Sequence, residues 1–527
     1  MDNRISIDRR GFVALGGATA AGLAISSLTD IRMVSANEKT ESGWEPPCLA
    51  KPAPIESSKI VDHHEYDIVI VGAGNAGVPA ALSALKNGAS VCVVEKNAGP
   101  FTQGIEASGI RLETSDEAAI QYLINVHMEA NGYRPVREVV ETWAHRSGEA
   151  LQYLLDYSKD NDDPIIISES EADPTVYPDS DKKADVFWVG ATEGTFSAGM
   201  IALADQAEKD GVDFFYSTPA VQLVQGDDGA VTGVICQNEQ GEYVQFDATK
   251  GVILAAGDYQ NDAEMVKWFS PDVQNETPRQ MGKTGDTIKM GYWAGGVIEP
   301  VGHTKMCHGA DSEPMTSEPF LRVNMEGNRF SAEVMPLSLV QSLFRVSGKP
   351  TEYVQLFDGA YETKVASWGG KPVSVEKLGT YMEDDPDYNG RSQLFKDDTI
   401  EGLAAKLEID PKVLSATVER YNELCAKGSD EDFGKDAKYM QPLDTPPFYG
   451  ARCGLRLTAI TSGLLTDGNQ RVVDAQGKPI KGLYAAGNTA GGFFGATDYP
   501  LYTIQGLSIG KAITGGYVAA ENAAKGL

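Results

Sequence analysis

Six residues near the start of the chain, Gly-Ala-Gly-Asn-Ala-Gly at 72–77, have the types and the spacing that bind a dinucleotide. In such a turn Gly72 allows the tight bend, Gly74 lets the backbone approach a diphosphate, and Gly77 lets the following helix pack on the preceding strand. The amides and the dipole at the N-terminus of that helix attract the diphosphate. About 20 residues further on, Glu95 is placed to accept hydrogen bonds from ribose hydroxyls. The predicted chemistry therefore starts with a bound dinucleotide.

A second glycine motif, Gly-Leu-Tyr-Ala-Ala-Gly-Asn at 482–488, lies about 400 residues further along the chain. A nicotinamide-binding domain needs only the first motif, whereas a flavin enzyme that wraps one FAD with both ends of its chain needs both. The apolar stretch 251–257 ends in small residues that suit a close approach to a cofactor. The pairing predicts FAD as the cofactor and hydride transfer at its flavin as the chemistry.

Regular elements must position these residues. The apolar run 68–71 is typical of a buried parallel strand, a helix should follow at 78–86, and a second strand at 90–94 ends in Glu95. Hydrophobic periodicity and turn residues predict further helices at 116–127, 136–159, 195–210 and 508–523, and further strands at 220–225, 231–237, 243–247 and 251–257.

Composition divides the chain into segments. Residues 37–64 are rich in Pro, Ser, Glu and Lys, and they look like a linker. Over 264–440 the helical pattern is less regular and Gly and Pro breaks are frequent, which indicates a separate domain. The expected fold class is α/β. A discontinuous Rossmann-like FAD-binding domain, formed by 65–263 and 441–527, would carry an inserted α+β capping domain at 264–440.

The first 36 residues differ in kind from the rest. Arg9 and Arg10 precede a small-residue apolar stretch at 14–25, and Val-Ser-Ala at 34–36 supplies a cleavage site. Paired arginines before a mildly hydrophobic segment are typical of a twin-arginine export signal. The alternative is an uncleaved membrane anchor, for which the stretch is short and rich in Gly and Ala. We predict that the signal at 1–36 is removed and that the protein is periplasmic or on the outer face of the cytoplasmic membrane.

Charge and cysteine content exclude several classes of function. The formal net charge is −30, which disfavours nucleic acid as a partner. None of the six cysteines forms a CxxC pair, so neither a zinc site nor a disulfide framework is expected. CxxCH is absent too, so no haem is expected. Residues 189–192, Val-Gly-Ala-Thr, are similar to a covalent FMN-attachment motif, but Asp185 is out of register with it. We expect non-covalent FAD and no FMN.

Taken together, these segments resemble the FAD-dependent fumarate reductase and 3-ketosteroid dehydrogenase superfamily, from about Tyr66 to the C-terminus. Besides the glycine motifs, the landmarks are Thr-Gly-Asp at 284–286 and a GxRFxxE segment at 327–333. The resemblance implies a two-part flavin domain and a mobile capping domain, with the substrate at their junction.

The resemblance also implies which residues contact FAD. Glu95 would bind the adenosine ribose, Val221 would meet adenine through its backbone, and Asn488 replaces the more usual acid near the ribitol. Residues 99–104 stand where the family usually has Gly-Gly-Asn or Gly-Gly-His. The residues expected at the cofactor are Gly72, Gly74, Asn75, Ala76, Gly77, Glu95, Lys96, Ser108, Gly109, Val221, Ala256, Gly257, Gly487, Asn488, Thr503 and Ile504.

The chain departs from the fumarate-type pattern at the substrate. No arginine follows GxRFxxE within 334–338, no histidine occurs in 458–463, and Asp498 stands where HGANR has its arginine. Binding two carboxylates needs fixed cations, for which arginine is preferred. We therefore predict that the substrate is not fumarate or succinate. A larger, flatter and mostly apolar substrate is favoured by the aromatic residues expected beside the flavin, which are Phe493, Phe494, Tyr499 and Tyr502.

Four residues are candidates for the catalytic step. Tyr499 and Tyr502 could each hydrogen-bond a carbonyl as charge builds, or supply a proton, and the alternative for both is aromatic packing. His303 lies where the family often has a substrate-side histidine, and a core or capping histidine is the alternative. Arg329 belongs to GxRFxxE, a motif that shapes the contact between cap and flavin, so a structural role is its alternative. Three other arginines could replace the missing proton donor: Arg322, Arg345 and Arg456.

We predict a reductase of an activated C=C bond, in which hydride passes from flavin N5 to the β-carbon of an enone or enoate. No second Rossmann unit for NAD(P)H is visible in the sequence, so electrons must come from an external donor, expected to be a membrane quinol-linked cytochrome. One alternative is a ketosteroid-type dehydrogenase that runs the reverse reaction on a ketone. The other is an electron-transfer flavoprotein subunit without its own organic substrate.

Overall fold

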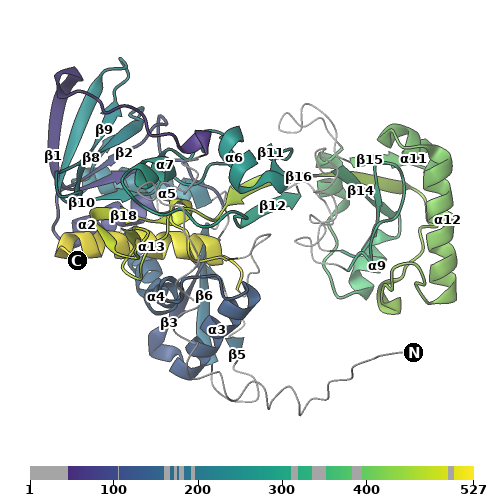
Figure 1. The fold of residues 1–527 in the computed structure, drawn as a ribbon. Coiled ribbons are helices and arrows are strands. Elements are labelled where there is room, and N and C mark those ends of the chain that lie inside the picture. The colour runs from purple at the N-terminus through teal and green to yellow at the C-terminus, as the bar shows by residue number, and fades with distance from the viewer. Residues whose placement is uncertain are drawn as a thin grey trace, which may run out of the picture.

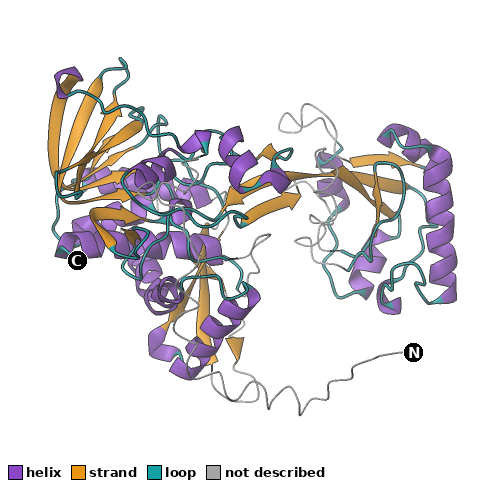
Figure 2. Cartoon of the chain, in the orientation of Figure 1, coloured by secondary structure: helices purple, strands orange, loops and turns teal. Residues whose placement is uncertain are grey.

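The structure is a computed structural model, and it describes residues 46–104, 106–159, 167–170, 175–176, 183–191, 196–309, 318–334, 352–382, 394–495 and 504–527. The chain forms a larger body around a parallel sheet and a smaller body at the far end of the long strand β16 (Phe448–Ile460) (Figure 1). Helices and strands occur in both bodies (Figure 2), so the predicted α/β class is confirmed.

Five parallel strands form the centre of the larger body. Residues 68–71 and 91–94 pair with each other and are all buried, as expected for apolar strands that are covered on both faces. The fifth strand belongs to the C-terminal motif, so both ends of the chain contribute to one sheet. The domain that the sequence predicts to bind FAD is therefore discontinuous. In spatial order the strands are β7 (Asp213–Phe215), β2 (Val91–Val94), β1 (Ile60–Val71), β10 (Tyr243–Leu254) and β18 (Pro479–Ala485).

Antiparallel strands extend this sheet. One strand pairs with β18, and the N-terminal half of β10 carries a two-strand meander. The predicted meander is therefore confirmed, although β10 is one continuous strand where the sequence indicated two. The added strands are β17 (Arg471–Val473), β9 (Val231–Gln237) and β8 (Ala220–Gln225).

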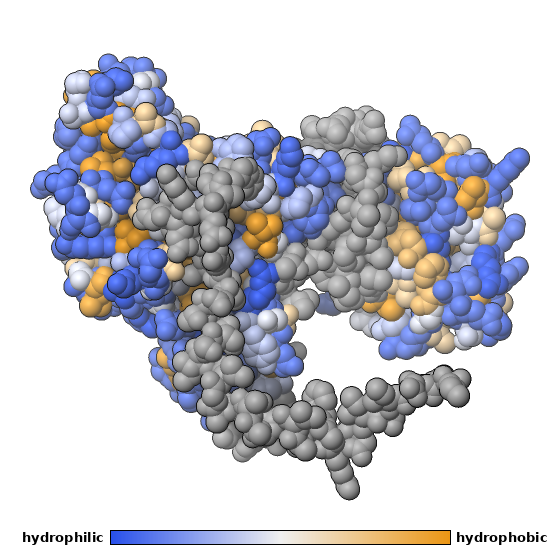
Figure 3. Space-filling view, in the orientation of Figure 1, coloured by the Kyte–Doolittle hydropathy of each residue, from blue (hydrophilic) through white to orange (hydrophobic). Residues whose placement is uncertain are grey.

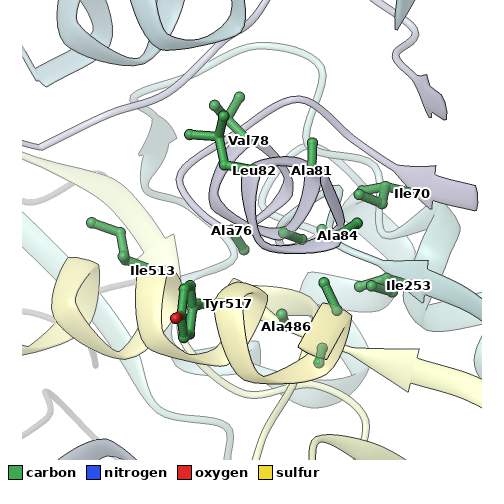
Figure 4. Close-up of a cluster of buried hydrophobic side chains, with 14 of the residues drawn as sticks. Ile70, Ala76, Val78, Ala81, Leu82, Ala84, Ile253, Ala486, Ile513 and Tyr517 are labelled. Atoms are coloured by element: carbon green, nitrogen blue, oxygen red, sulfur yellow. The ribbon is translucent and has the colours of Figure 1, made fainter. Parts of the chain in front are cut away.

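Helices cover both faces of the parallel sheet. On one face α2 and α13 lie side by side, with Ala84 and Tyr517 in the apolar layer that they share with the sheet (Figure 4). The Ser83 hydroxyl on α2 donates to the Tyr517 carbonyl oxygen at 2.8 Å. The helices of this face are α2 (Gly77–Lys86), α4 (Arg137–Lys159), α5 (Phe196–Lys209) and α13 (Leu507–Lys525), and those of the other face are α6 (Ala263–Phe269) and α7 (Asp286–Trp293).

A second, antiparallel sheet lies beside α4. Its first strand approaches the beginning of α13 closely, because the Ser108 amide donates to the Gly506 carbonyl oxygen at 3.1 Å. The unit packs through an apolar cluster that includes Trp143 and Phe493. Its elements are β3 (Glu106–Arg111), β4 (Ile167–Ser170), β5 (Thr175–Val176), β6 (Lys183–Ala191) and α3 (Glu117–Ala130).

The smaller body is built on the N-terminal half of β16. Residues 448–454 pair there with the neighbouring strands of the cap, while the C-terminal half of β16 pairs with two strands next to the larger body. One strand thus runs through both bodies (Figure 1). The cap elements are β13 (Leu321–Asn324), β14 (Glu352–Asp358), β15 (Leu394–Asp397), α9 (Tyr361–Ser367), α10 (Val375–Thr380), α11 (Ile400–Leu407) and α12 (Pro411–Lys427), and the two remaining strands are β11 (Thr277–Pro278) and β12 (Lys305–Gly309).

The insertion begins later in the chain than the sequence predicted. Met265, Ile288 and Cys307 belong to the same apolar cluster as the flavin-domain sheet, so the first part of the predicted cap, 264–309, packs with the larger body. The cap clusters begin at Phe320 and Leu321. Frequent Gly and Pro breaks in 264–309 mark irregular connections within the flavin domain rather than a change of domain.

The described part of the predicted linker is anchored to the larger body at a few points, although most of its residues are exposed. β1 begins at Ile60, and Leu49 is 2% exposed within the cluster that covers the sheet. The Trp293 indole nitrogen donates to the Leu49 carbonyl oxygen at 2.9 Å. Residues 46–64 therefore belong to the flavin domain. A low content of apolar residues hid this because one buried leucine and a few hydrogen bonds suffice to dock the segment.

The face of the molecule in Figure 3 is mainly hydrophilic, with small apolar patches, in keeping with a net charge of −30. Within the described ranges, none of the helices has the length and apolar character that crossing a bilayer requires. The predicted export signal at 1–36 lies outside the described residues, as do Tyr499, Tyr502 and Thr503.

Candidate active site

The glycine turn between β1 and α2 is shaped by close backbone contacts. Gly72 has φ +106°, and a Cβ there would lie 2.7 Å from the Ala256 Cα. A Cβ on Gly77 would lie 1.8 Å from the Gly72 carbonyl oxygen, so only glycine lets the helix start this close to the strand. A Cβ on Gly74 would have one neighbour within 4 Å among the described residues, the Phe101 carbonyl oxygen at 3.5 Å. The turn is therefore closed on the protein side and open where a diphosphate would approach.

The C-terminal motif meets this turn directly. β18 runs parallel to β10, and the Ala486 amide donates to the Leu254 carbonyl oxygen at 3.0 Å. Gly487 has φ +63°, and a Cβ there would lie 3.0 Å from the Ala76 Cβ. A Cβ on Gly516 of α13 would lie 2.0 Å from the Ala76 carbonyl oxygen. The two motifs that are far apart in sequence thus form one site.

A pocket opens at the carboxyl ends of the parallel strands, where α/β folds bind their ligands. Gly72, Gly74, Glu95 and Ala256 line it. Glu95 is 8% exposed. Its carboxylate accepts hydrogen bonds from the Ala73 amide at 2.8 Å and from the backbone and side-chain nitrogens of Asn97 at 2.9 and 2.7 Å. A carboxylate has about four acceptor positions, so Glu95 is fixed in place with capacity left for a ribose hydroxyl.

Several buried polar atoms next to the turn have no hydrogen-bond partner among the described residues. An unpaired buried polar atom costs about 1–3 kcal/mol, so a group of them indicates a ligand that satisfies them. Asn75 and Gln280 bracket the segment 99–104 by donating to the Gln103 and Thr102 carbonyl oxygens, at 2.9 and 3.5 Å. The unsatisfied atoms are Asn75 Oδ1, Thr102 Oγ1, Gln103 Oε1 and Gln280 Oε1. FAD carries ribityl hydroxyls and a ring N–H that suit such acceptors, so the residues present fit FAD.

The remaining predicted cofactor residues differ in their contacts and in their distance from the pocket. Gly257 lies beside Ala256, and its amide donates to Thr489 Oγ1 at 3.1 Å. Lys96 lines the pocket but is paired, with Nζ 2.9 Å from Asp286 Oδ2. Asn488 Nδ2 donates to Asp258 Oδ2 at 3.4 Å. The pocket lining includes neither Gly257 nor Asn488. Four further candidates also lie outside it, and their roles stay predictions: Ser108, Gly109, Val221 and Ile504.

The environments of three of these four residues are well defined. Ser108 is fully buried, and its hydroxyl finds no partner among the described residues. Ile504 is 6% exposed in the cluster around Trp143. Ala220 and Pro219 line the pocket, one and two positions before Val221. The backbone contact to adenine that the resemblance implies for Val221 stays a prediction.

His303 is packed in the core of the flavin domain. The Tyr259 hydroxyl donates to His303 Nδ1 at 2.6 Å, and His303 Nε2 donates to the Glu299 carbonyl oxygen at 2.8 Å. The Phe269 ring stacks on the imidazole with a centroid distance of 4.6 Å. Because both ring nitrogens are used, this geometry favours the alternative of a core histidine over a substrate-side one.

The buried imidazole should make stability depend on pH. Burial lowers the pKa of His303 to about 4, with Lys305 and Arg134 acting in the same direction, whereas the hydrogen bond to Glu299 opposes it. Because the folded-state pKa lies below the ordinary 6.5, the neutral imidazole stabilises the fold above pH 6.5, and this contribution is lost as the pH falls towards 4. One proton corresponds to at most about 1.4 kcal/mol per pH unit.

A His303→Gln variant tests this dependence. We expect its melting temperature to fall less than that of the wild type between pH 7 and pH 5, as measured by thermal scans in matched buffers. Equal acid sensitivity of the two proteins would show that His303 does not titrate as a core imidazole.

Arg329 is held in a network of charges within the cap. Its Nε and Nη2 donate to the two Glu333 oxygens at 2.8 and 3.0 Å, and its Nη1 and Nη2 donate to the two Asp430 oxygens at 3.0 and 2.7 Å. Lys435 Nζ lies 3.1 Å from Glu333 Oε2. Both carboxylates are fully buried as side chains. All three guanidinium nitrogens are thus engaged, which favours the structural alternative for Arg329.

The other substrate-side candidates are only partly described. Phe493 and Phe494 are fully buried and pack against His127, with Trp143 next to Phe493, so they form core rather than pocket lining. Arg322 is 2% exposed and donates to the Glu333 carbonyl oxygen at 3.2 Å. Tyr499, Tyr502 and Arg345 lie outside the described residues, and they stay predictions.

Two buried polar groups of the site were missed by the sequence analysis. Asp258 is 1% exposed; burial raises the pKa of its carboxyl, and Lys283 acts in the opposite direction. Gln260 is 2% exposed and links Asp258 to the Thr458 carbonyl oxygen, at 3.2 and 3.1 Å. Their position directly after the stretch 251–257 was the available signal, because residues at the carboxyl end of a parallel strand face the ligand.

Known proteins resemble this chain over most of its length. The family model described as an FAD binding domain matches residues 67–499. The vinyl phenol reductase of Lactiplantibacillus plantarum is 29% identical over 504 residues, which cover 88% of this chain and 98% of that protein. The urocanate reductase of Eggerthella lenta is 26% identical over 537 residues, which cover 96% of this chain and 82% of that protein.

The fold has a counterpart among solved structures. The open conformation of a flavocytochrome c3 fumarate reductase matches with a TM-score of 0.69 and 23% identity, over 89% of this chain and 79% of that chain. This likeness supports the fold, while the family model supports the cofactor that the buried acceptors and the glycine turn indicate. The chain belongs to the FAD binding domain family, within the fumarate reductase and 3-ketosteroid dehydrogenase superfamily that its motifs predicted.

Proposed function

We propose that this protein is an exported FAD-dependent reductase of an activated C=C bond, and that its substrate is a fairly large, apolar or aromatic enone or enoate rather than fumarate. It is an oxidoreductase acting on CH–CH groups, as its named relatives are. The observation that carries the proposal is the junction of the two glycine motifs, which meet at Ala76 and Gly487 in one FAD site.

Each described residue of the site has a binding task in this proposal. The amides at the start of α2 would hold the diphosphate, and Glu95 would hold the adenosine ribose. The acceptors along 99–104 would orient the flavin. Bound FAD supplies the hydride. Because the protein fixes these groups before the substrate arrives, its contribution to the reaction is orientation and electrostatics.

The proposed substrate class rests on charge and on the named relatives. The arginine and histidine positions of the fumarate-type pattern are occupied here by uncharged residues in 334–338 and 458–463. A dianion bound without fixed cations would lose its hydration without compensation. The printed names of two relatives refer to vinyl phenol and to urocanate, so alkene reduction on planar unsaturated molecules occurs among proteins similar to this one.

Export and the electron donor complete the proposal. Arg9 and Arg10 precede the apolar stretch 14–25, which supports a twin-arginine signal and a periplasmic location. Outside the cytoplasm soluble NAD(P)H is absent, so a membrane quinol-linked cytochrome is the proposed donor. FAD is proposed to be non-covalent, with no haem and no FMN in this chain.

Anaerobic reoxidation of the reduced protein tests the function. We expect cinnamates, vinyl phenols or other aromatic enones and enoates to restore the oxidised flavin spectrum rapidly, and fumarate to act at least about 100-fold more slowly, because one lost charged contact costs about 1.5–3 kcal/mol and fumarate would lose several. The matched control is the protein without added alkene. Rapid reoxidation by fumarate would reject the proposed substrate class.

The same panel addresses the two alternatives. A ketosteroid-type dehydrogenase would be reduced by a saturated ketone, starting from its oxidised form. An electron-transfer subunit would be reoxidised by a partner protein but by no alkene of the panel. Catalysis by C=C reduction is favoured over the subunit because the described residues of the cap pack around two apolar clusters of their own, which an electron carrier does not need.

A further inference from the structure

Lys283 is a half-buried lysine in the pocket that contains the glycine turn, and the dinucleotide motif does not call for it. A Cβ built on Gly257 would lie 3.0 Å from Lys283 Nζ and 3.3 Å from its Cδ, so the lysine side chain crosses the bare face of that glycine. Gly257 directly follows Ala256, which is the residue that the turn packs against at Gly72. The side chain therefore enters the pocket beside the turn.

The Phe101 ring also places the Lys283 ammonium beside the glycine turn. Lys283 Nζ lies 5.8 Å from the centroid of the Phe101 ring. The carbonyl oxygen of Phe101 is the atom nearest to the open position at Gly74, where a diphosphate would approach. The ammonium therefore lies near the turn by two independent contacts, one with Gly257 after β10 and one with Phe101 in the segment 99–104.

The two lysines of the pocket differ in their partners. Lys96 Nζ donates to Thr284 Oγ1 at 2.8 Å and pairs with Asp286 Oδ2 at 2.9 Å. Within the described ranges, the hydrogen bonds of Lys283 are made by its backbone, which exchanges them with Asn261. In the described part of the chain no carboxylate forms a salt bridge with its ammonium. Lys283 is thus the pocket lysine whose charge is available to a ligand.

The charge environment suits an anionic ligand. Burial lowers the pKa of Lys283, and Asp258 and Glu95 act against this by raising it. Glu95 is already committed to three hydrogen bonds, and Asp258 is bound to Gln260 and Asn488. A dianionic diphosphate next to the ammonium would favour its charged form further.

We propose that the Lys283 ammonium binds the diphosphate of FAD, as a side-chain cation added to the backbone amides of the turn. This inference rests on the FAD site and not on any substrate. It concerns a lysine at the position before the Thr-Gly-Asp segment of this chain, which the cofactor motifs do not specify. The competing role is neutralisation of Glu95 and Asp258 alone, without contact to phosphate.

The test is the affinity of the purified holoprotein for FAD, measured from the fluorescence of FAD released on dilution at several NaCl concentrations. We expect Lys283→Met to raise the Kd by about ten-fold or more, because a hydrogen bond to a charged group is lost. Lys283→Arg should stay within about three-fold of the wild type. The salt dependence of the Kd should become shallower in Lys283→Met. Lys267→Met, which removes an exposed lysine on α6, is the matched control and should change neither quantity.

Displacement of FAD by ADP and by adenosine separates phosphate binding from general damage. In Lys283→Met we expect ADP to lose displacing strength about ten-fold relative to wild type, after correction for the altered FAD affinity, while adenosine keeps its strength. If the methionine variant melts at a lower temperature without FAD, Lys283→Gln replaces it. A change in Kd of two-fold or less in both variants, or an equal loss for ADP and adenosine, would overturn the proposal. None of these readouts involves an alkene, so a wrong substrate class would leave them unchanged.

Discussion

Replacing Gly77 with alanine should abolish FAD binding and lower the free energy of unfolding by about 3 kcal/mol. The new Cβ would lie 1.8 Å from the Gly72 carbonyl oxygen and 2.9 Å from its carbonyl carbon, and both are backbone atoms that no rotamer change can move. Relief requires α2 to shift away from β1. Such a shift would also disturb Ala76, which touches the C-terminal motif, so the whole cofactor site would be affected.

Gly74→Ala is the matched control for this prediction. Its Cβ would meet only the Phe101 carbonyl oxygen at 3.5 Å, which is an ordinary contact. We expect the stability of the FAD-free protein to stay within about 1 kcal/mol of the wild type, while FAD affinity falls because the methyl group occupies the approach of the diphosphate. Denaturant titrations without FAD and flavin content after purification measure the two effects. If Gly74→Ala binds FAD as the wild type does, the diphosphate does not approach the turn there.

Replacing Arg329 with methionine should destabilise the cap by about 3–5 kcal/mol, because it leaves buried carboxylates without their main partner. Glu333 and Asp430 are both fully buried as side chains. Among the described residues, Lys435 would remain as the cation beside Glu333, while Asp430 would keep its hydrogen bonds from backbone amides. The control is Arg420→Met in the same cap, since Arg420 is 47% exposed and pairs with Asp432 at the surface. Exposed pairs contribute about 0–1 kcal/mol, so this variant should unfold almost as the wild type does.

The loss of stability caused by Arg329→Met should also be smaller at low pH. Burial would raise the pKa of Asp430, but hydrogen bonds from Arg329 and from backbone amides outweigh it and hold the pKa below the usual range. In the wild type this carboxylate therefore contributes stability above its ordinary pKa, and the contribution is lost as the pH falls through the folded-state value. Without Arg329 the buried Asp430 carboxylate should take up a proton more readily, which reduces the destabilisation that the unpaired charge causes. Calorimetric scans of the wild type and of Arg329→Met at pH 7.5 and pH 4.5 measure this difference in stability. A larger difference at pH 4.5 would contradict the prediction.

Local patterns predicted most elements of the flavin domain. The strand at 220–225 has those bounds, and the helix at 136–159 begins one residue later, at Arg137. Hydrophobic periodicity and turn residues predict the bounds of these elements because each element of that domain must bury one defined face. The joint site was predictable because it depends on glycines, which the sequence shows directly. A side chain at Gly72 or Gly77 would meet backbone atoms, and one at Gly487 would meet Ala76.

Features that depend on tertiary packing could not be predicted locally. The boundary of the cap was wrong because residues 264–309 are irregular in sequence yet pack with the flavin-domain sheet. His303 gave no sign of its partners Tyr259 and Phe269, because the three residues come from separate segments. Lys283 was missed because a single lysine in a loop has neither period nor motif. Its significance arises only from the neighbours that the fold brings to it.

The most direct measurement of the central claim is the flavin content of the purified protein before and after denaturation. The account predicts a yellow protein that releases one FAD per chain into the filtrate when it is denatured, with no flavin left on the polypeptide. A colourless protein that takes up no FAD on titration, or flavin that stays attached to the denatured chain, would contradict it.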